Sequence, residues 1–513
     1  MDVTSENLRL VLGIKLKQLR NDRNLSLKEL SEQTDLSISY LSEIEKGKKY
    51  PKPEKIMSLA RALNTTFDEL VTLKVDEALD PITAVFNSSA IREFPFALFG
   101  IEPQSLMDLF SNSPVKAGAL LRTLLEILRG YDMSVEHFML SALRSYQKMH
   151  LNYFEDLEDA ADRFMAENKW KHKLPVLTEQ FERTLISRYN YDIDETTLAE
   201  YWELQKFRSV LLNTGQHASR PRLLLNSKLV PRQKAFIYGR ELGYCYLELT
   251  ERALTSSWVK VESFEQVLNN FKASYFAGAL MMHRDAMHKD LARMFQKRQW
   301  DATGFLALLD RYDVTPEMFL YRMTEIMPKF FGLSEIHFMR FSHETESGQI
   351  NLTKFLNMSH GFTPYGLSLN EHYCRRWLPV AMLTKQHHNI ATTDPRHPLV
   401  QVQRAQFTER DEEYFVISLA RRFALKPSYH TTVSIGLLMN KDFKDIVRFW
   451  DDPAIEKVQV NETCERCSLS ERACKDRVAP PTIYEKDLRQ RVREKVLAKV
   501  IGNGVQRKPK SRR

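Results

Sequence analysis

Apolar residues near the N-terminus recur at the spacing of an amphipathic α-helix, and the pattern repeats in the short segments that follow. The first segment runs from about 7 to 23. Ser26, with Glu29 three residues later, has the form of a capping box, which predicts the start of a second helix. Ser37 is suited to cap a third helix and Gly47 to end it. The remaining predicted helices of this region cover 54–63 and 66–72.

Beyond these helices the pattern changes twice. Residues 76–100 are typical of a linker, and 101–310 carry helical periodicity almost throughout. From about residue 315 alternating apolar positions appear, which are typical of strands. We therefore predict a mainly α, multidomain protein with a smaller α+β part over 311–490 and a basic tail over 491–513. In the α+β part the pattern predicts strands at 335–341, 349–356 and 433–438, and a helix at 409–422.

Composition and charge restrict the class of protein but do not identify its function. The chain has 513 residues, 43% of them hydrophobic and 27% charged, which is ordinary for a globular protein. The sequence has no apolar run of eighteen residues, and its first residues lack the form of a secretory signal. The five cysteines are few and odd in number, which favours a reducing compartment, and we expect a cytoplasmic protein without a membrane span. The net charge of +8 permits binding to nucleic acid.

The N-terminal helices resemble the phage-repressor type of helix-turn-helix domain. The segments Leu25–Ser31 and Leu36–Pro51 match the signature of that family, and the resemblance spans residues 8–73. It implies a domain over 1–75 that binds double-stranded DNA as a homodimer, with the third helix in the major groove. Arg20 and Glu45 occupy the positions of the family's internal ion pair. By position, the residues facing base edges would be Ser37, Ser39, Tyr40 and Glu43, and those neutralising phosphates Lys46, Lys48 and Lys49.

A segment of the middle region, about 220–284, resembles the metallopeptidase domain that is often fused to such repressors. That family binds zinc through two histidines four residues apart on one helix, with a glutamate as the base. Here Arg240 and Tyr244 replace the histidines and only Glu241 remains. Arginine cannot ligate zinc, and Asn270 stands where an acidic ligand is expected. We therefore predict a peptidase fold without peptidase activity, so not an enzyme, in a region suited to ligand binding or dimerisation.

Three cysteines lie within eleven residues near the end of the chain. Cys464, Cys467 and Cys474 are separated by two and then six residues. Thiolates at this density are typical of zinc or iron–sulfur sites, but a four-coordinate centre needs one more ligand. Cys374 is the better fourth ligand because its neighbours are polar, whereas Cys245 follows an apolar helix and is typical of a core thiol. Three unligated thiols remain an alternative.

The spacing favours one metal centre over another. Three close cysteines with one distant cysteine are common for [4Fe–4S] clusters, whereas zinc sites more often pair two knuckles. We therefore favour a [4Fe–4S] cluster, with zinc as the alternative.

The order of these parts resembles one family of bacterial regulators. A repressor-type domain, a helical middle, a degenerate peptidase-like segment and a C-terminal Thr463-Cys464-Glu-Arg-Cys467 motif occur together in the short-chain fatty-acyl transcriptional regulators. The resemblance implies control of short-chain fatty acid metabolism in response to an acyl-coenzyme A, whose contacting residues the sequence does not identify. Two alternatives stay open: a transcription factor that senses redox state or oxygen through its cluster, and a regulatory metalloprotease.

Overall fold

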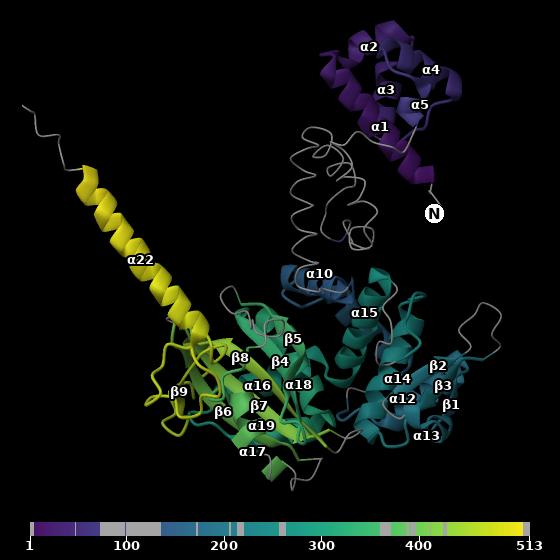
Figure 1. Cartoon of the computed structure of the whole chain (residues 1–513). Helices are drawn as coiled ribbons and strands as arrows, with labels where there is room; N and C mark the ends of the chain where they lie inside the picture. Colours follow the sequence, from purple (N-terminus) through teal and green to yellow (C-terminus); the bar gives the residue numbers. More distant parts are fainter. Residues whose placement is uncertain are drawn as a thin grey trace, which may run out of the picture. The chain divides into compact units, whose positions relative to one another are not determined.

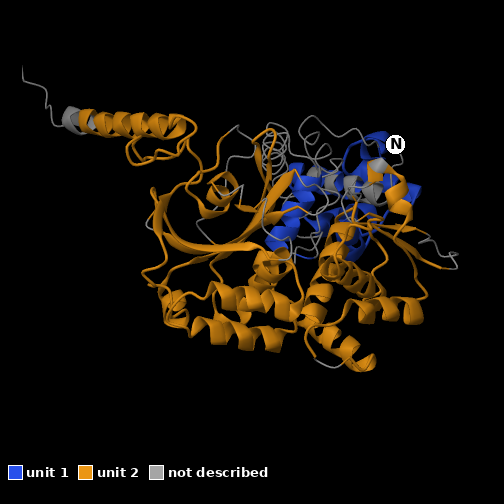
Figure 2. Cartoon of the chain, turned by 90° about the horizontal axis from the view of Figure 1, so that it is seen from below, with its two compact units in different colours: residues 1–146 blue, residues 147–513 orange. Residues whose placement is uncertain are grey.

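The computed structural model forms two compact units, residues 1–146 and 147–513, which Figure 2 distinguishes by colour. The boundary falls within helix α10, Val135–Met149. The predicted linker at 76–100 lies outside the described residues except at position 98, and so does the tail beyond residue 505. The structure describes residues 5–46, 48–71, 98, 135–170, 173–204, 207–212, 220–255, 263–359, 371–385, 389–390, 397–410, 412–423 and 428–505.

Unit 1 begins with a small helical domain whose helices start where the sequence predicts. The Ser26 hydroxyl accepts the Glu29 amide at 3.2 Å, and the Glu29 carboxylate accepts the Ser26 amide at 2.7 Å, so the capping box is present. Its core is formed by residues such as Leu16, Leu41 and Ile44, all fully buried. The helices are α1 (Ser5–Asp22), α2 (Leu27–Thr34), α3 (Ile38–Glu45), α4 (Pro53–Ala62) and α5 (Phe67–Val71).

Unit 2 opens with a helical layer around a small sheet (Figure 1). The sheet has the strand order β1-β3-β2. Two helices, α14 (Pro231–Tyr246) and α15 (Phe264–Met281), pack closely because glycines on one face alanines on the other. A Cβ added at Gly243 would lie 3.1 Å from the backbone of Ala273. The other elements are α11 (Glu155–Glu167), α12 (Thr178–Tyr189), β1 (Asp192–Asp194), α13 (Thr197–Glu200), η2 (Trp202–Leu204), β2 (Ser209–Leu212) and β3 (Arg222–Leu225).

Three helices connect this layer to the larger sheet of unit 2. They are α16 (Arg284–Phe295), α17 (Ala302–Tyr312) and α18 (Pro316–Phe331). The sheet has six strands in the order β5-β4-β8-β7-β6-β9, antiparallel except for the β6–β9 pair. Its strands are β4 (Ile336–Glu344), β5 (Ile350–Asn357), β6 (Leu399–Phe407), β7 (Glu413–Arg422), β8 (Tyr429–Leu438) and β9 (Lys457–Val460).

Both faces of the six-stranded sheet are covered. Phe338 and Ile417 belong to the core that includes α18, whereas Met339 and Val416 belong to a second core with α19, Leu378–Lys385. This division follows the alternation of side chains along a strand. The sheet also corrects one prediction, because 409–422 is not a helix but mainly strand β7. A strand buried on both faces has no two-residue period, so its apolar run looks like that of a buried helix.

The chain's last described elements follow the sheet. A short helix, α21 (Lys441–Ile446), precedes β9, and the cysteine segment follows that strand. Helix α22, Thr482–Val505, then crosses the predicted boundary between 490 and 491. The prediction of mixed α and α+β architecture is confirmed. None of the helices described here is long and apolar enough to span a membrane.

A buried ion cluster in unit 2 predicts a specific pH dependence. Glu158 and Glu325 share the single guanidinium of Arg322, at 2.6 and 2.7 Å. Burial raises the pKa of Glu325 to about 8, despite the opposing effect of Arg322. Glu325 therefore keeps its proton in the folded protein at pH values where the unfolded chain has released it. Folding stability should fall as the pH rises from about 5 to about 8.

Replacing Glu325 by glutamine should remove this contribution. Between pH 5 and pH 8, E325Q should lose less unfolding free energy than the parent protein, by on the order of a few kcal/mol. Urea unfolding at both pH values measures the difference. E179Q, which changes an exposed glutamate at the start of α12, is the matched control. An identical pH dependence in E325Q and the parent would show that Glu325 is ionised in the folded state.

Candidate functional site

Helix α3 presents the side chains that the sequence analysis assigned to DNA. Ser39 is exposed, whereas Tyr40 and Glu43 are half-buried. Ser37 is exposed too, but its hydroxyl caps the helix by accepting the Tyr40 amide at 3.2 Å. The predicted internal ion pair is present, since Arg20 Nε donates to Glu45 at 2.6 Å beneath α3. This ion pair fixes the buried side of α3, while Ser37 and Ser39 are exposed to solvent.

The basic loop after α3 is exposed and partly ordered by α3 itself. Lys46, Lys48 and Lys49 are exposed, and Lys49 forms an ion pair with Glu43 at 2.7 Å. Sequence reasoning missed Lys55, whose ammonium lies 4.3 Å from the centre of the Tyr40 ring. In the sequence, Lys55 follows the lysines of the basic loop at a short spacing and extends the positive charge onto α4.

The peptidase-like helix α14 carries a neutralised carboxylate where a catalytic base would stand. Glu241 is 1% exposed and accepts hydrogen bonds from Arg252 at 2.5 Å and from the Tyr191 hydroxyl at 3.2 Å. The Arg252 guanidinium also covers the Tyr244 ring at 3.9 Å. Burial opposes the charge of Arg252, but Glu241 and the tyrosines together hold its pKa above the usual value.

This arrangement differs from a zinc-peptidase site in its charge. The histidine positions hold Arg240 and Tyr244, and Glu241 has a cation as its partner instead of a metal-bound water. Asn270 is half-buried on α15, while the neighbouring Asn269 donates its amide to the Glu251 carbonyl at 3.0 Å. The residues present do not fit the zinc ion of a peptidase. The prediction that the protein is not an enzyme stays a prediction.

The four cysteines of the predicted metal site lie in one neighbourhood, although they come from two distant segments. Tyr373 forms a β-bridge with Thr463, the Cys374 amide donates to the Glu462 carbonyl at 3.1 Å, and the Cys464 amide donates to His372 at 2.8 Å. Cys374, Cys464, Cys467 and Cys474 are all buried. Cys245 lies apart from them on α14, with its sulfur 3.6 Å from the Tyr191 hydroxyl.

The chemistry of this neighbourhood suits thiolates, but the thiols are not gathered around a common point. Burial raises the pKa of Cys374 to about 11, and backbone amides of Asn461 and Arg376 donate to its sulfur and oppose that rise. Cys464 and Cys467 act in the same direction as burial, because like charges repel. Within the described part of the chain, no group of three or more Cys, His, Asp or Glu side chains is arranged to hold a metal ion.

Polar residues that the sequence analysis did not single out join the two cysteine segments. Glu371 accepts hydrogen bonds from Thr463 at 2.6 Å and from Arg466 at 2.8 and 2.9 Å. Glu465 binds His372 through both its backbone amide and its ring. These residues lie close to the cysteines in the sequence, which is the one signal for them. Their hydrogen-bond partners are about ninety residues away, so only the fold identifies the pairs.

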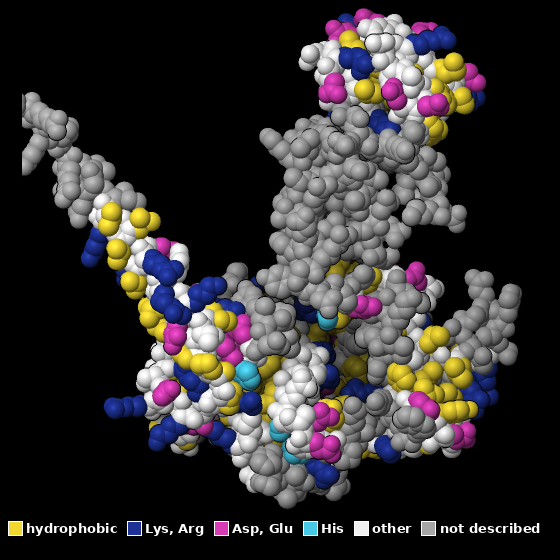
Figure 3. All heavy atoms as spheres, in the orientation of Figure 1, with side chains coloured by type: hydrophobic (Ala, Val, Ile, Leu, Met, Phe, Trp, Pro, Cys, Tyr) yellow, Lys and Arg dark blue, Asp and Glu magenta, His cyan; other side chains and the backbone are white. Residues whose placement is uncertain are grey.

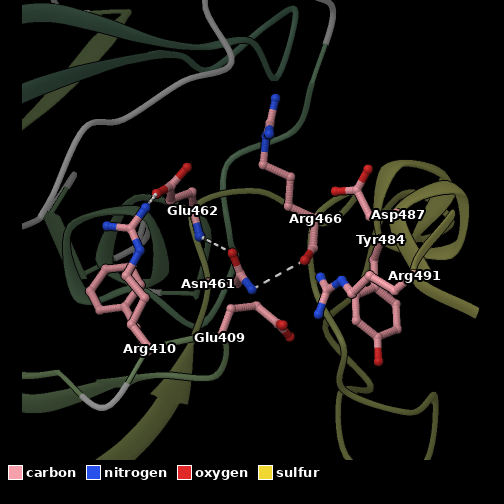
Figure 4. A pocket seen from close by; sticks show the side chains of 9 residues that line it. Glu409, Arg410, Asn461, Glu462, Arg466, Tyr484, Asp487 and Arg491 are labelled. Carbon is pink, nitrogen blue, oxygen red and sulfur yellow. Dashed lines mark hydrogen bonds and ion pairs between the residues drawn. The ribbon is translucent and has the colours of Figure 1, made fainter. Parts of the chain in front are cut away.

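A pocket of about 250 Å³ lies between the cysteine segment and the start of α22. Figure 4 shows its lining, in which Arg410 and Glu462 form an ion pair at 2.7 Å. Asp487 and Arg491 of α22 line the opposite side. Positive and negative side chains are balanced here, so the pocket shows no preference for one charge.

Comparison with known families agrees with the repressor-type assignment and with the metallopeptidase-like assignment of the middle region. Residues 16–70 match the helix-turn-helix family, and residues 171–324 match the IrrE N-terminal-like domain of the M78 peptidases. No curated protein matches the chain. The family matches support a DNA-binding transcriptional regulator that contains a repressor-type domain and an IrrE-like domain.

Two solved structures are similar to parts of the chain. A Mycobacterium tuberculosis transcriptional regulator is 18% identical, with a TM-score of 0.45, over 66% of this chain and 92% of its own. The apo form of ComR from S. Thermophilus is 16% identical, with a TM-score of 0.12, over 56% of this chain and 100% of its own.

The lysines after α3 predict how DNA binding responds to salt. Replacing Lys48 and Lys49 by alanine should weaken binding to promoter DNA and reduce the slope of log K against log salt by about 2. K289A, which removes an exposed lysine of α16, is the matched control. Fluorescence anisotropy across a salt series measures both effects. An unchanged slope in the double variant would remove these lysines from the interface.

Proposed function

We propose that this protein is a cytoplasmic transcriptional regulator of short-chain fatty acid metabolism whose affinity for DNA depends on a bound acyl-coenzyme A. The DNA-binding part rests on α3, where Ser39 is exposed and Tyr40 and Glu43 are half-buried, and on the three exposed lysines that follow it. Binding as a homodimer would place two copies of α3 in successive major grooves. Unit 2 would hold the ligand and control the spacing of those helices.

The peptidase-like segment around α14 supports a binding role for unit 2 over a catalytic one. Its one remaining candidate base, Glu241, is buried in an ion pair with Arg252. Arg252 and Tyr191 both donate to this carboxylate, so its hydrogen-bond partners here are protein side chains. We infer that the IrrE-like fold serves as a scaffold here, and that the protein is not an enzyme.

The cysteine segment supports a [4Fe–4S] cluster as a proposed cofactor, with zinc as the alternative. Cys374, Cys464, Cys467 and Cys474 would hold it, and the amides of Asn461, Arg376 and Leu469 would donate to the sulfurs. Such a cluster supplies redox sensitivity when bound. A second candidate function, a regulator that senses redox state or oxygen, is favoured by the burial of all four thiols in two segments joined by backbone hydrogen bonds.

Acyl-coenzyme A sensing predicts reciprocal coupling between ligand and DNA. Propionyl- or acetyl-coenzyme A should change the dissociation constant for promoter DNA, because a ligand shifts an equilibrium only if it binds the two states unequally. DNA should change the affinity for the acyl-coenzyme A by the same factor. Anisotropy measures the first effect and isothermal titration calorimetry the second, with free coenzyme A as the control for the acyl group. If no acyl-coenzyme A binds at millimolar concentrations, the sensing proposal fails.

The cysteine assignment predicts the metal content of single variants. Protein purified without oxygen should contain iron and sulfide in equal amounts and absorb visible light. C374S should lose most of this iron, whereas C245S should keep it because Cys245 lies apart. Metal analysis and an absorbance spectrum separate the cases. Zinc without sulfide would indicate a zinc site in place of the cluster. Protein that contains neither iron nor zinc would contradict the proposed metal site.

A further inference from the structure

The positive excess of this protein is concentrated in the stretch that begins with helix α22. From Glu485 to Arg513 the sequence has eleven Lys and Arg against three Asp and Glu, so this stretch alone accounts for the net charge of +8. Residues 1–75, which contain the helix-turn-helix domain, have thirteen Lys and Arg against eleven Asp and Glu. The domain assigned to DNA is therefore nearly neutral, and the charge that attracts a polyanion lies at the other end of the chain.

Helix α22 is anchored at its first turn and is exposed beyond it. The amides of Ile483 and Tyr484 donate to the Glu465 carbonyl of the cysteine segment, at 3.0 and 2.9 Å. Every residue from Glu485 to Val500 is exposed. Most helices in proteins are stabilised by packing one face against the fold, and an isolated helix is only marginally stable in water. This 24-residue helix therefore has its faces available to a partner.

Helical spacing arranges the side chains of α22 in three parallel rows, because residues four apart lie on the same side of a helix. Glu494 lies on the side opposite the middle row, where its carboxylate accepts a hydrogen bond from Gln490 at 2.9 Å. Figure 3 shows Lys, Arg and hydrophobic side chains together along this helix. The rows are Arg489 and Arg493, then Val492 and Val496, then Lys495 and Lys499.

The cations of the two outer rows lack a counter-charge. In the described part of the chain, none of these four residues forms an ion pair. Like charges four residues apart on one helix repel each other and destabilise it. Arg489 faces this repulsion from Arg493, and Lys495 faces it from Lys499. An anionic partner that reached both rows would relieve it.

We propose that α22 binds the major groove of duplex DNA, as a second contact in addition to α3. The major groove admits an α-helix, a phosphate strand borders it on each side, and thymine methyl groups lie among its base edges. The two cation rows would meet the two phosphate strands, and the valine row would face the bases between them. Glu494 would point away from the DNA. This inference rests on the DNA binding of the proposed function and does not depend on the acyl-coenzyme A.

The same rows fit two other partners less well. Helices that lie on lipid surfaces usually bury large apolar side chains such as Trp, Phe and Leu, whereas the middle row of α22 consists of valines. A second copy of α22 would bring the same two cation rows against the first, and like charges repel. Duplex DNA has negative charge on both sides of an apolar-accepting groove, which matches all three rows.

Neutralising the outer rows in the full-length protein tests the contact. R493Q/K495Q/K499Q should reduce the slope of log K against log salt by about 3, because each lost phosphate contact lowers it by about 1. At low salt the same variant should bind at least about tenfold more weakly. Fluorescence anisotropy with a labelled duplex of mixed sequence, across a salt series, measures both effects. Equal slopes in the variant and the parent would overturn the proposal.

A matched variant controls for the loss of net charge. K289Q/R298Q/K441Q removes three exposed cations elsewhere in unit 2, and its slope should equal that of the parent. Both triple variants should melt at the temperature of the parent, because all six side chains are exposed. The same loss of slope in both variants would mean that overall charge, and not α22, determines binding, and would overturn the proposal.

E494Q tests the orientation of the helix. This change adds as much positive charge as R493Q removes, but on the side of α22 that points away from the DNA. The affinity of E494Q for the duplex should therefore stay within about twofold of the parent's. An increase as large as the decrease caused by R493Q would overturn the placement of the three rows in the groove.

The variants of the basic loop separate this inference from the proposed function. If K48A/K49A lowers the salt slope and R493Q/K495Q/K499Q does not, the inference about α22 fails while DNA binding by α3 stands. If neither lowers the slope, both fail. Vesicles that contain phosphatidylserine and sedimentation measurements test the other two partners. If the α22 variant binds DNA like the parent but loses binding to vesicles or changes its oligomeric mass, the DNA proposal fails.

Discussion

The guanidinium of Arg322, 1% exposed, holds unit 2 together. It donates to both oxygens of Glu158 on α11, to Glu325 one turn along α18, and to the Met282 carbonyl at the end of α15. Tyr275 adds a hydrogen bond from α15 to Glu158 at 2.7 Å. Removing one member of such a buried cluster leaves a charge without a partner, so its cost is large. Arg322 therefore links α11, α15 and α18 at one buried point.

Helix α18 also provides an ionic link to the six-stranded sheet. Its first turn carries Glu317, whose carboxylate pairs with Arg340 on β4 and with Lys354 on β5. Glu317 therefore joins the start of α18 to two neighbouring strands of the sheet.

Glu241 stands where a peptidase of the similar family has its catalytic base, but its partner here is an arginine. In a peptidase the carboxylate would face a metal-bound water, whereas here Arg252 occupies its side and covers Tyr244. The sequence predicted the loss of the metal ligands, since Arg240 and Tyr244 stand in their places. Arg252 lies eleven residues from Glu241, and the direction of its side chain depends on how the chain leaves α14. The sequence therefore did not predict that the guanidinium of Arg252, and not a metal ion, would be the positive partner of Glu241.

Local residue patterns determined those elements of the protein whose structure depends on residues near them in the sequence. The capping box at Ser26, the N-cap at Ser37 and the helical periodicity of unit 1 were predictable, since each depends on residues within a few positions of one another. Strand β7 was not, because burial on both faces removes the alternation that identifies a strand. Nor was the cluster in which Arg340 and Lys354 share the carboxylate of Glu317. Charges that far apart in the chain interact only after the sheet and α18 have packed, so tertiary structure alone decided which cations would share one carboxylate.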